Sequence, residues 1–89
     1  ALLHFTRSMA AEYATAGIRV NALAPGPTDT TMVRSTGPEG AASMARSTRL
    51  GRLADADEMV GAVLYMASEA SSFMTGQCIT VDGGLVPAR

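Results

Sequence analysis

The stretch that decides the fold is residues 18–32, IRVNALAPGPTDTTM. Its first part, residues 18–23, is rich in apolar and β-branched side chains and has the length of a buried β-strand. The sequence PGP at positions 25–27 then ends the strand, because proline cannot donate to a sheet and is not tolerated in a strand interior. The stretch therefore predicts a strand that opens directly into a tight loop, and residues 25–30 are called the PG loop from here on.

The PG loop carries features of a ligand site. In open α/β sheets, ligands bind in the crevice beyond the carboxyl ends of the strands. Pro25 fixes the direction in which the chain leaves the strand, and Gly26 permits a close backbone approach. Thr28 and Thr30 offer hydroxyl groups to a polar ligand. An ordinary strand followed by a turn would use the same residue types, so the residues alone leave both interpretations open.

Composition limits the class of protein. Eighty-nine residues form one domain at most, and 47% apolar residues is typical of a globular chain. A net charge of −1 gives no reason to expect nucleic acid or anionic lipid as a partner. One cysteine, together with the lack of a signal-peptide pattern or a long apolar run, leads us to expect a cytoplasmic, non-membrane protein. All seven basic residues are arginine, so no mechanism that needs a lysine amine can be carried by these residues.

Helical patterns surround the PG loop. Apolar residues recur at three- and four-residue spacing over residues 2–13, and Gly17 is expected to end that helix. His4, near its start, has no carboxylate or nucleophile spaced to orient it and is interpreted as a surface or packing residue. Residues 34–40 are rich in turn formers, and residues 41–50 form a weak helical pattern whose arginines either grip an anion or lie on a solvated face.

The clearest helix start is Asp55, an N-cap with Glu58 three residues later. The helix is expected to run to residue 67 or 68. Its predicted packing face consists of Met59, Val60, Val63, Leu64 and Ala67. Phe73 and Met74 are expected to turn inward, and residues 77–81, QCITV, form a second short strand. A strand, a crossover helix and another strand predict parallel pairing, with one strand edge left open.

The chain resembles the C-terminal part of the short-chain dehydrogenase/reductase family. Asn21, Pro25, Gly26 and Thr30 match the family pattern of a strand followed by a Pro-Gly loop, whereas Thr28 stands where the family has an aliphatic residue. The segments ALLHFTRSMAAEYATAGIRVN and GRLADADEMVGAVLYMASEASSFMTGQCITVDGG are similar to the family's long helix and to its last helix and strand. This alignment puts the family's catalytic lysine just before the first residue, and the sequence contains no Tyr-x-x-x-Lys.

The resemblance implies an α/β fold: the C-terminal portion of a Rossmann-type, doubly wound parallel sheet, in the order helix, strand, lid helix, helix, strand. Residues 1–89 would form one partial NAD(P)-binding domain, with residues 31–53 as the substrate lid. The implied activity is hydride transfer between NAD or NADP and a small-molecule alcohol or carbonyl, similar to that of 3-oxoacyl reductases. Pro25, Gly26, Thr28 and Thr30 would bind the nicotinamide end of the cofactor, with Thr28 contacting the carboxamide mainly through its backbone.

The same resemblance implies a homotetramer or homodimer. The helix at residues 2–13 would belong to one interface, and the helix at 56–67 with the last strand would belong to another. No metal site and no catalytic residue are assigned, and the 89 residues alone are expected to be inactive. Two alternatives stay open: a non-catalytic remnant that self-associates or binds a partner, and a fragment of a longer enzyme.

Overall fold

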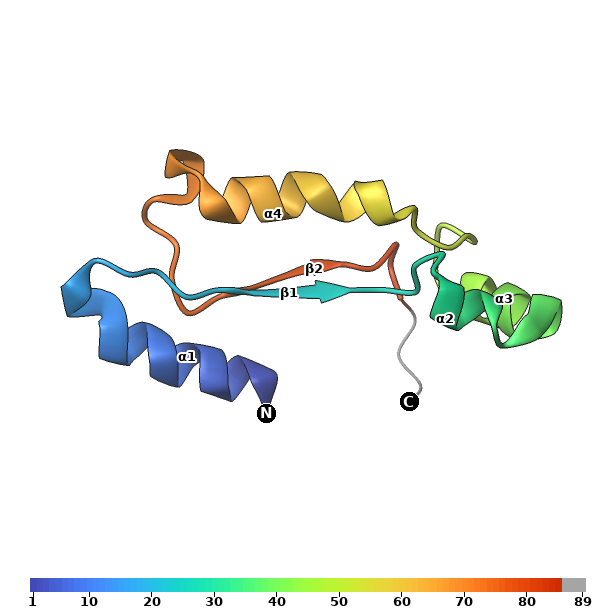
Figure 1. Ribbon diagram of the computed structural model, residues 1–89, viewed down its shortest axis with the longest axis horizontal. Helices are drawn as coiled ribbons and strands as arrows, with labels where there is room; N and C mark the ends of the chain where they lie inside the picture. The colour runs from blue at the N-terminus through green and yellow to red at the C-terminus, as the bar shows by residue number, and fades with distance from the viewer. Residues whose placement is uncertain (86–89) are drawn as a thin grey trace.

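The structure is a computed structural model that describes residues 1–85. Its centre is a sheet of two parallel strands, β1 (Ala22–Pro25) and β2 (Cys78–Val81), in which Ala22 pairs with Cys78 and Pro25 with Val81. Helix α1 (Leu2–Tyr13) lies along one side of the sheet and α4 (Val60–Ala67) along the other (Figure 1). Two further helices, α2 (Thr31–Arg34) and α3 (Gly37–Arg46), extend beyond the carboxyl ends of the strands. The predicted α/β fold with a parallel sheet is confirmed.

Most of the local signals in the sequence form the expected elements. Helix α1 has the predicted bounds, and a 3-10 turn (Ala14–Ala16) ends at Gly17, whose φ of 76° is the left-handed conformation that favours glycine. The helix predicted to start after Asp55 begins with a 3-10 turn (Ala56–Met59) and continues as α4. A third 3-10 turn, Glu69–Ser71, follows α4.

The first strand begins later than predicted and includes Pro25. Before Ala22 the chain is extended, but its polar groups bond to the loop before β2: Gly76 N donates to Val20 O at 2.8 Å. Ala22 N and Gly26 N both donate across the sheet, to Gln77 O and Val81 O. The nitrogen of Pro25 therefore faces the open edge of the sheet, where a missing N–H costs no ladder hydrogen bond.

Three other expectations are wrong. Helix α3 starts inside the predicted turn-rich segment because Pro38 occupies its first turn, where proline is tolerated. Of the predicted packing face of α4 and the turn before it, Met59 is half-buried as expected, but Leu64 is 63% exposed, and the other half-buried side chains are Ala62 and Met66. Phe73 is fully exposed, since the next residue, Met74, takes the inward position.

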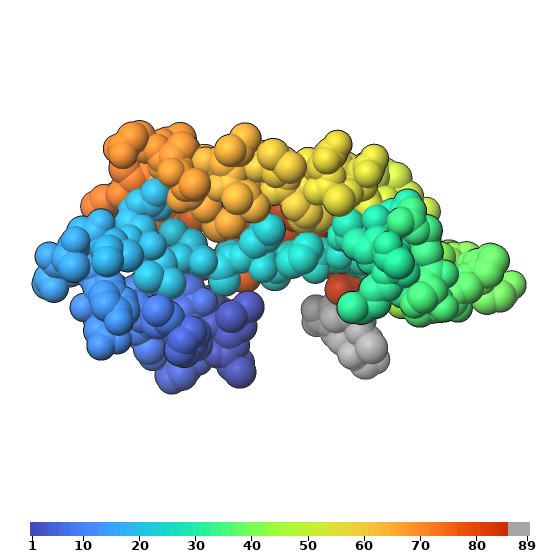
Figure 2. Space-filling view, viewed as in Figure 1, coloured from blue at the N-terminus to red at the C-terminus, as the bar shows by residue number. Residues whose placement is uncertain are grey.

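Little of the described chain is buried. The buried apolar residues are Ala10 and Ala22, and the Cα radius of gyration is 15.5 Å, against about 12 Å for a compact domain of this length. Figure 2 shows β1 uncovered between α1 and α4 on one face of the molecule. Within residues 1–85 the predicted open strand edge is therefore present, and exposed apolar side chains on the neighbouring segments include Phe5 in α1, Ile18 before β1 and Val63 in α4.

Candidate functional site

The PG loop leaves the sheet between two other segments of the chain. On one side lies the turn after β2, and the contact there is tight, because a Cβ on Gly26 would stand 2.6 Å from Asp82 Cα. On the other side lie residues 53–55. Ala54 N donates to Pro27 O at 2.9 Å and Asp29 N donates to Ala54 O at 2.8 Å, so Thr28 and Ala54 form a parallel bridge. The loop is therefore part of a three-segment junction at the carboxyl end of the sheet.

The four predicted site residues adopt different environments along this loop. Pro25 is exposed at the end of β1, and Gly26 is half-buried against Asp82, so its missing side chain makes room for the protein's own backbone. The Thr28 hydroxyl donates to Gly26 O at 3.0 Å. Thr30 is exposed and caps α2, its hydroxyl oxygen accepting from Val33 N at 3.3 Å. The Thr30 hydroxyl proton stays available to a ligand, because the cap uses only the oxygen.

The backbone of Thr28 is the chemically open part of the loop. Its neighbours Pro27 and Asp29 bond to Ala54, but within residues 1–85 neither the N–H nor the C=O of Thr28 has a hydrogen-bond partner. A primary amide such as the nicotinamide carboxamide presents one acceptor oxygen and a donor NH₂ group. The free N–H and C=O of Thr28 match that pair, so the residues present fit the group that the sequence leads us to expect.

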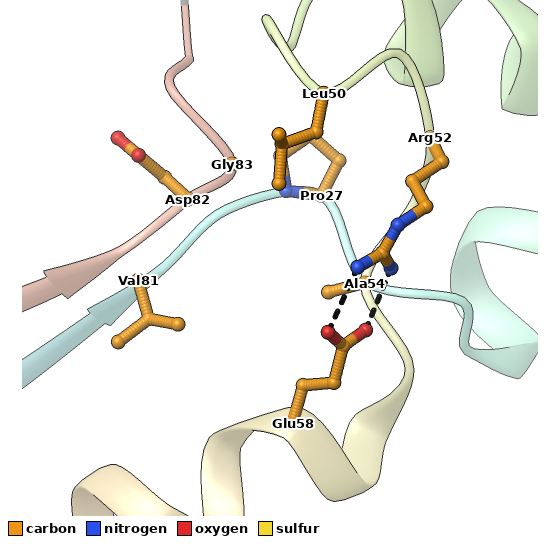
Figure 3. A pocket seen from close by; sticks show the side chains of 8 residues that line it. All are labelled: Pro27, Leu50, Arg52, Ala54, Glu58, Val81, Asp82 and Gly83. Atoms are coloured by element: carbon orange, nitrogen blue, oxygen red, sulfur yellow. Dashed lines mark hydrogen bonds and ion pairs between the residues drawn. The ribbon is translucent and has the colours of Figure 1, made fainter.

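A small cavity of about 100 Å³ lies behind the loop (Figure 3). The residues that line it are Pro27, Leu50, Arg52, Ala54, Glu58, Val81, Asp82 and Gly83. None of the four predicted site residues lines this cavity, and it is small for a cofactor, so we assign it to the support of the PG loop. Leu50 lies over Pro27, and the Asp82 side chain points away from the Arg52–Glu58 pair.

Arg52 and Glu58 form a bidentate ion pair at the edge of this cavity. Arg52 Nη1 donates to Glu58 Oε1 at 2.7 Å and Nη2 to Oε2 at 3.0 Å. The Arg52 hydrogen bond and the Asp55 N–H, which donates to Oε1 at 2.8 Å, lower the pKa of Glu58 from 4.5 to about 2. The cap between Asp55 and Glu58 was predicted from the sequence, and Arg52 belongs to the Gly-Arg-Leu run in the segment that resembles the family, but the ion pair between Arg52 and Glu58 was not predicted.

The Glu58 pKa predicts a pH-dependent contribution to stability. Since the pKa is lower in the folded state, the carboxylate stabilises the fold fully above about pH 4.5, and this contribution is lost as the pH falls towards 2. We expect the difference in urea midpoint between the wild-type protein and Glu58→Gln to shrink over that window, as measured by urea unfolding at pH values from 2 to 7. A difference that stays constant across the window would contradict this.

Two kinds of site or segment are not found in the described part of the chain. No three His, Cys, Asp or Glu side chains among residues 1–85 are grouped so that they could hold a metal ion. Over the same residues, every helix is too short or too polar to cross a membrane.

Comparisons with known proteins identify the family. Residues 1–86 match the family model described as enoyl-(acyl carrier protein) reductase. The chain belongs to the short-chain dehydrogenase/reductase family, which confirms the resemblance drawn from the PG loop and the flanking helices.

Individual relatives are oxidoreductases. Cis-4-hydroxycyclohexanecarboxylate dehydrogenase of Sinomonas cyclohexanicum is 46% identical over 81 residues, which cover 91% of this chain and 32% of the relative. The 3-oxoacyl-[acyl-carrier-protein] reductase of Salmonella typhimurium is 38% identical over 84 residues, covering 94% and 34%. The crystal structure of the same kind of reductase from Brucella melitensis superposes with a TM-score of 0.89 at 41% identity, covering 98% of this chain and 32% of that one. The chain thus spans about a third of the length of these relatives.

Proposed function

We propose that this chain forms part of an NAD(P)(H)-dependent oxidoreductase that interconverts an alcohol and a carbonyl, similar to 3-oxoacyl reductases. Residues 25–30 would hold the nicotinamide end of the cofactor, and residues 31–53 would form the substrate lid. The observation that carries the proposal is the N–H and C=O of Thr28, which have no hydrogen-bond partner among residues 1–85 and are held between two anchored neighbours at the carboxyl end of the sheet. The cofactor would supply the hydride, and the PG loop would fix the orientation of its carboxamide.

The remaining parts of the site fit this role. Pro25 and Gly26 set the path of the loop, since Gly26 packs on Asp82 and its N–H is bound to Val81 O. Thr30 would donate its hydroxyl proton to the cofactor while its oxygen caps α2. The exposed apolar residues of α1 and α4 support assembly as a homodimer or homotetramer. We also propose a cytoplasmic location and no nucleic-acid or membrane partner.

The first test is the intact mass of the gene product together with titration by NADH and NADPH, followed by the fluorescence of the reduced nicotinamide. We expect a mass well above the 9.2 kDa of this chain, and saturable binding of at least one of the two cofactors. A gene product of full family length that binds neither cofactor would overturn the proposal.

A second candidate function is a non-catalytic remnant that self-associates. The observation in its favour is the small core, with Ala10 and Ala22 as the buried apolar residues among those described. Because the sequence has no lysine, we predict that a verified 89-residue preparation shows no NADPH oxidation. Turnover by that preparation would contradict the prediction, whereas a natural 9.2 kDa product that forms oligomers would favour the remnant.

Thr30 provides a specific test of the loop's role. Thr30→Ala removes the hydroxyl donor, and a lost hydrogen bond of about 1 kcal/mol weakens cofactor binding roughly fivefold. The same change also removes the cap of α2, so a variant that separates the two effects is needed.

Thr30→Asp keeps an oxygen for the cap but has no proton to donate, and Thr30→Ser keeps both. We expect the cofactor Kd of Thr30→Ser to stay close to that of the wild type, and those of the alanine and aspartate variants to rise. Equal affinity in all four proteins would leave Thr30 with the capping role alone.

A further inference from the structure

We propose that Arg52 and Glu58 are positioning residues for the PG loop. Their ion pair fixes residues 53–55, and these in turn fix the backbone of Thr28. The inference rests on the proposed function, because it assigns residues that act on the same loop without touching the cofactor. Neither residue was expected to act on this loop from the sequence, and both lie outside residues 25–30.

The first step is the contact between Ala54 and the loop. Its N–H donates to Pro27 O at 2.9 Å, and its C=O accepts from Asp29 N at 2.8 Å. These two hydrogen bonds flank Thr28 on both sides. A shift of Ala54 would therefore change the direction of the Thr28 N–H and C=O, the two groups proposed to bind the carboxamide.

The second step is how Ala54 is itself held. Arg52 Nη1 donates to Leu53 O at 3.2 Å, and Glu58 Oε1 accepts from Asp55 N at 2.8 Å. The residues before and after Ala54 are thus each bound by one partner of the ion pair, whose two side chains face each other beside Ala54 in Figure 3. Since Glu58 belongs to the 3-10 turn that leads into α4, the pair connects that helix to the loop.

The third step is the scale of the effect. The side chains of Arg52 and Glu58 are 56% and 42% exposed. Exposed ion pairs contribute little to global stability. If the pair only stabilised the fold, its removal would have small effects on stability, on the PG loop and on cofactor binding alike. If the pair positions the loop, its removal should change the loop and weaken cofactor binding, while the global free energy of unfolding changes little.

Hydrogen exchange in the cofactor-free gene product tests the positioning directly. In Arg52→Gln we expect the amides of Asp29 and Ala54 to exchange roughly tenfold faster, which corresponds to about 1.4 kcal/mol of lost local protection. The amides of Ala22 and Gly26, which donate across the sheet, should keep their rates within about twofold. Unchanged exchange at Asp29 and Ala54 would overturn the inference.

Cofactor titration supplies the second readout. We expect the Kd of NADH or NADPH to rise roughly threefold to tenfold in Arg52→Gln. Arg52→Lys keeps the charge but loses the two-pronged geometry, so it should recover only part of the affinity, and it replaces the glutamine variant if that variant fails to fold.

Ser71→Ala is the matched control. The Ser71 hydroxyl is buried after the opposite end of α4 and donates to Met66 O and Ser68 O, so its loss reduces stability without touching the loop. We expect its cofactor Kd to equal that of the wild type. A Kd that rises equally in the Ser71 and Arg52 variants would show a general stability effect and overturn the inference.

The two proposals fail in different ways. If the wild-type protein binds neither cofactor, the proposed function fails. If the wild type binds and the Arg52 variants bind equally well, the proposed function stands and the positioning role is wrong.

Discussion

Replacing Gly26 with alanine is expected to lower the free energy of unfolding by about 3 kcal/mol and to disturb the PG loop. The added Cβ would stand 2.6 Å from Asp82 Cα and 2.9 Å from Asp82 O, so the collision is with backbone rather than with the end of a flexible side chain. Gly26 is also fixed by the hydrogen bond from its N–H to Val81 O. The clash can therefore be relieved only if the ends of the two strands separate. Urea unfolding measures the resulting loss in the free energy of unfolding.

Gly61→Ala is the control for this change. Gly61 lies in α4, and a Cβ there would meet no atom within 4 Å. Alanine should therefore stabilise the protein by up to about 1 kcal/mol through its higher helix propensity. The two glycine-to-alanine changes are expected to have opposite signs. A Gly26→Ala variant as stable as the wild type would show that the approach of Asp82 is less close than the structure has it.

Features of the fold that depend on residues close together in the sequence were predictable. Helix α1, the left-handed Gly17 and the cap between Asp55 and Glu58 each follow from a local signal, and each is present. The inner face of α4 was not predictable in this way. Met59 is half-buried as predicted, but the pattern favoured Leu64 and Val63, which are more apolar than Ala62, whereas the half-buried residues of α4 are Ala62 and Met66.

The candidate site shows the same division. The four predicted residues all lie within the six positions of the PG loop, and their location at the carboxyl end of a strand follows from Pro25 and Gly26. Ala54 and Asp82, which hold the loop in place, come from segments more than twenty residues away. The side-chain types of these two residues do not predict the contact, because both residues meet the loop through backbone atoms. The structure adds this support.

Arg19→Ala is the second change with a large expected effect, a loss of about 3 kcal/mol in the free energy of unfolding. Its guanidinium donates to Met74 O and Met66 O, both at 3.0 Å, and to Ser68 O at 3.3 Å. These carbonyls lie at the end of α4 and in the loop that leads to β2. One half-buried side chain therefore holds together the segment before β1, the end of α4 and the approach to β2, and hydrogen bonds from a charged donor are the stronger kind.

Two further substitutions distinguish the contribution of the Arg19 hydrogen-bond donors from that of its positive charge. Arg19→Lys keeps the positive charge but offers a single compact ammonium group, which cannot span three carbonyls, so we expect an intermediate loss of stability. Arg46→Ala removes an exposed arginine in the last turn of α3 and should cost less than about 1 kcal/mol. Urea midpoints in the order wild type, Arg46→Ala, Arg19→Lys, Arg19→Ala would confirm that the guanidinium acts through its three donors. Equal losses in Arg19→Ala and Arg46→Ala would show that removing a positive charge explains the effect, because the two variants share only that change.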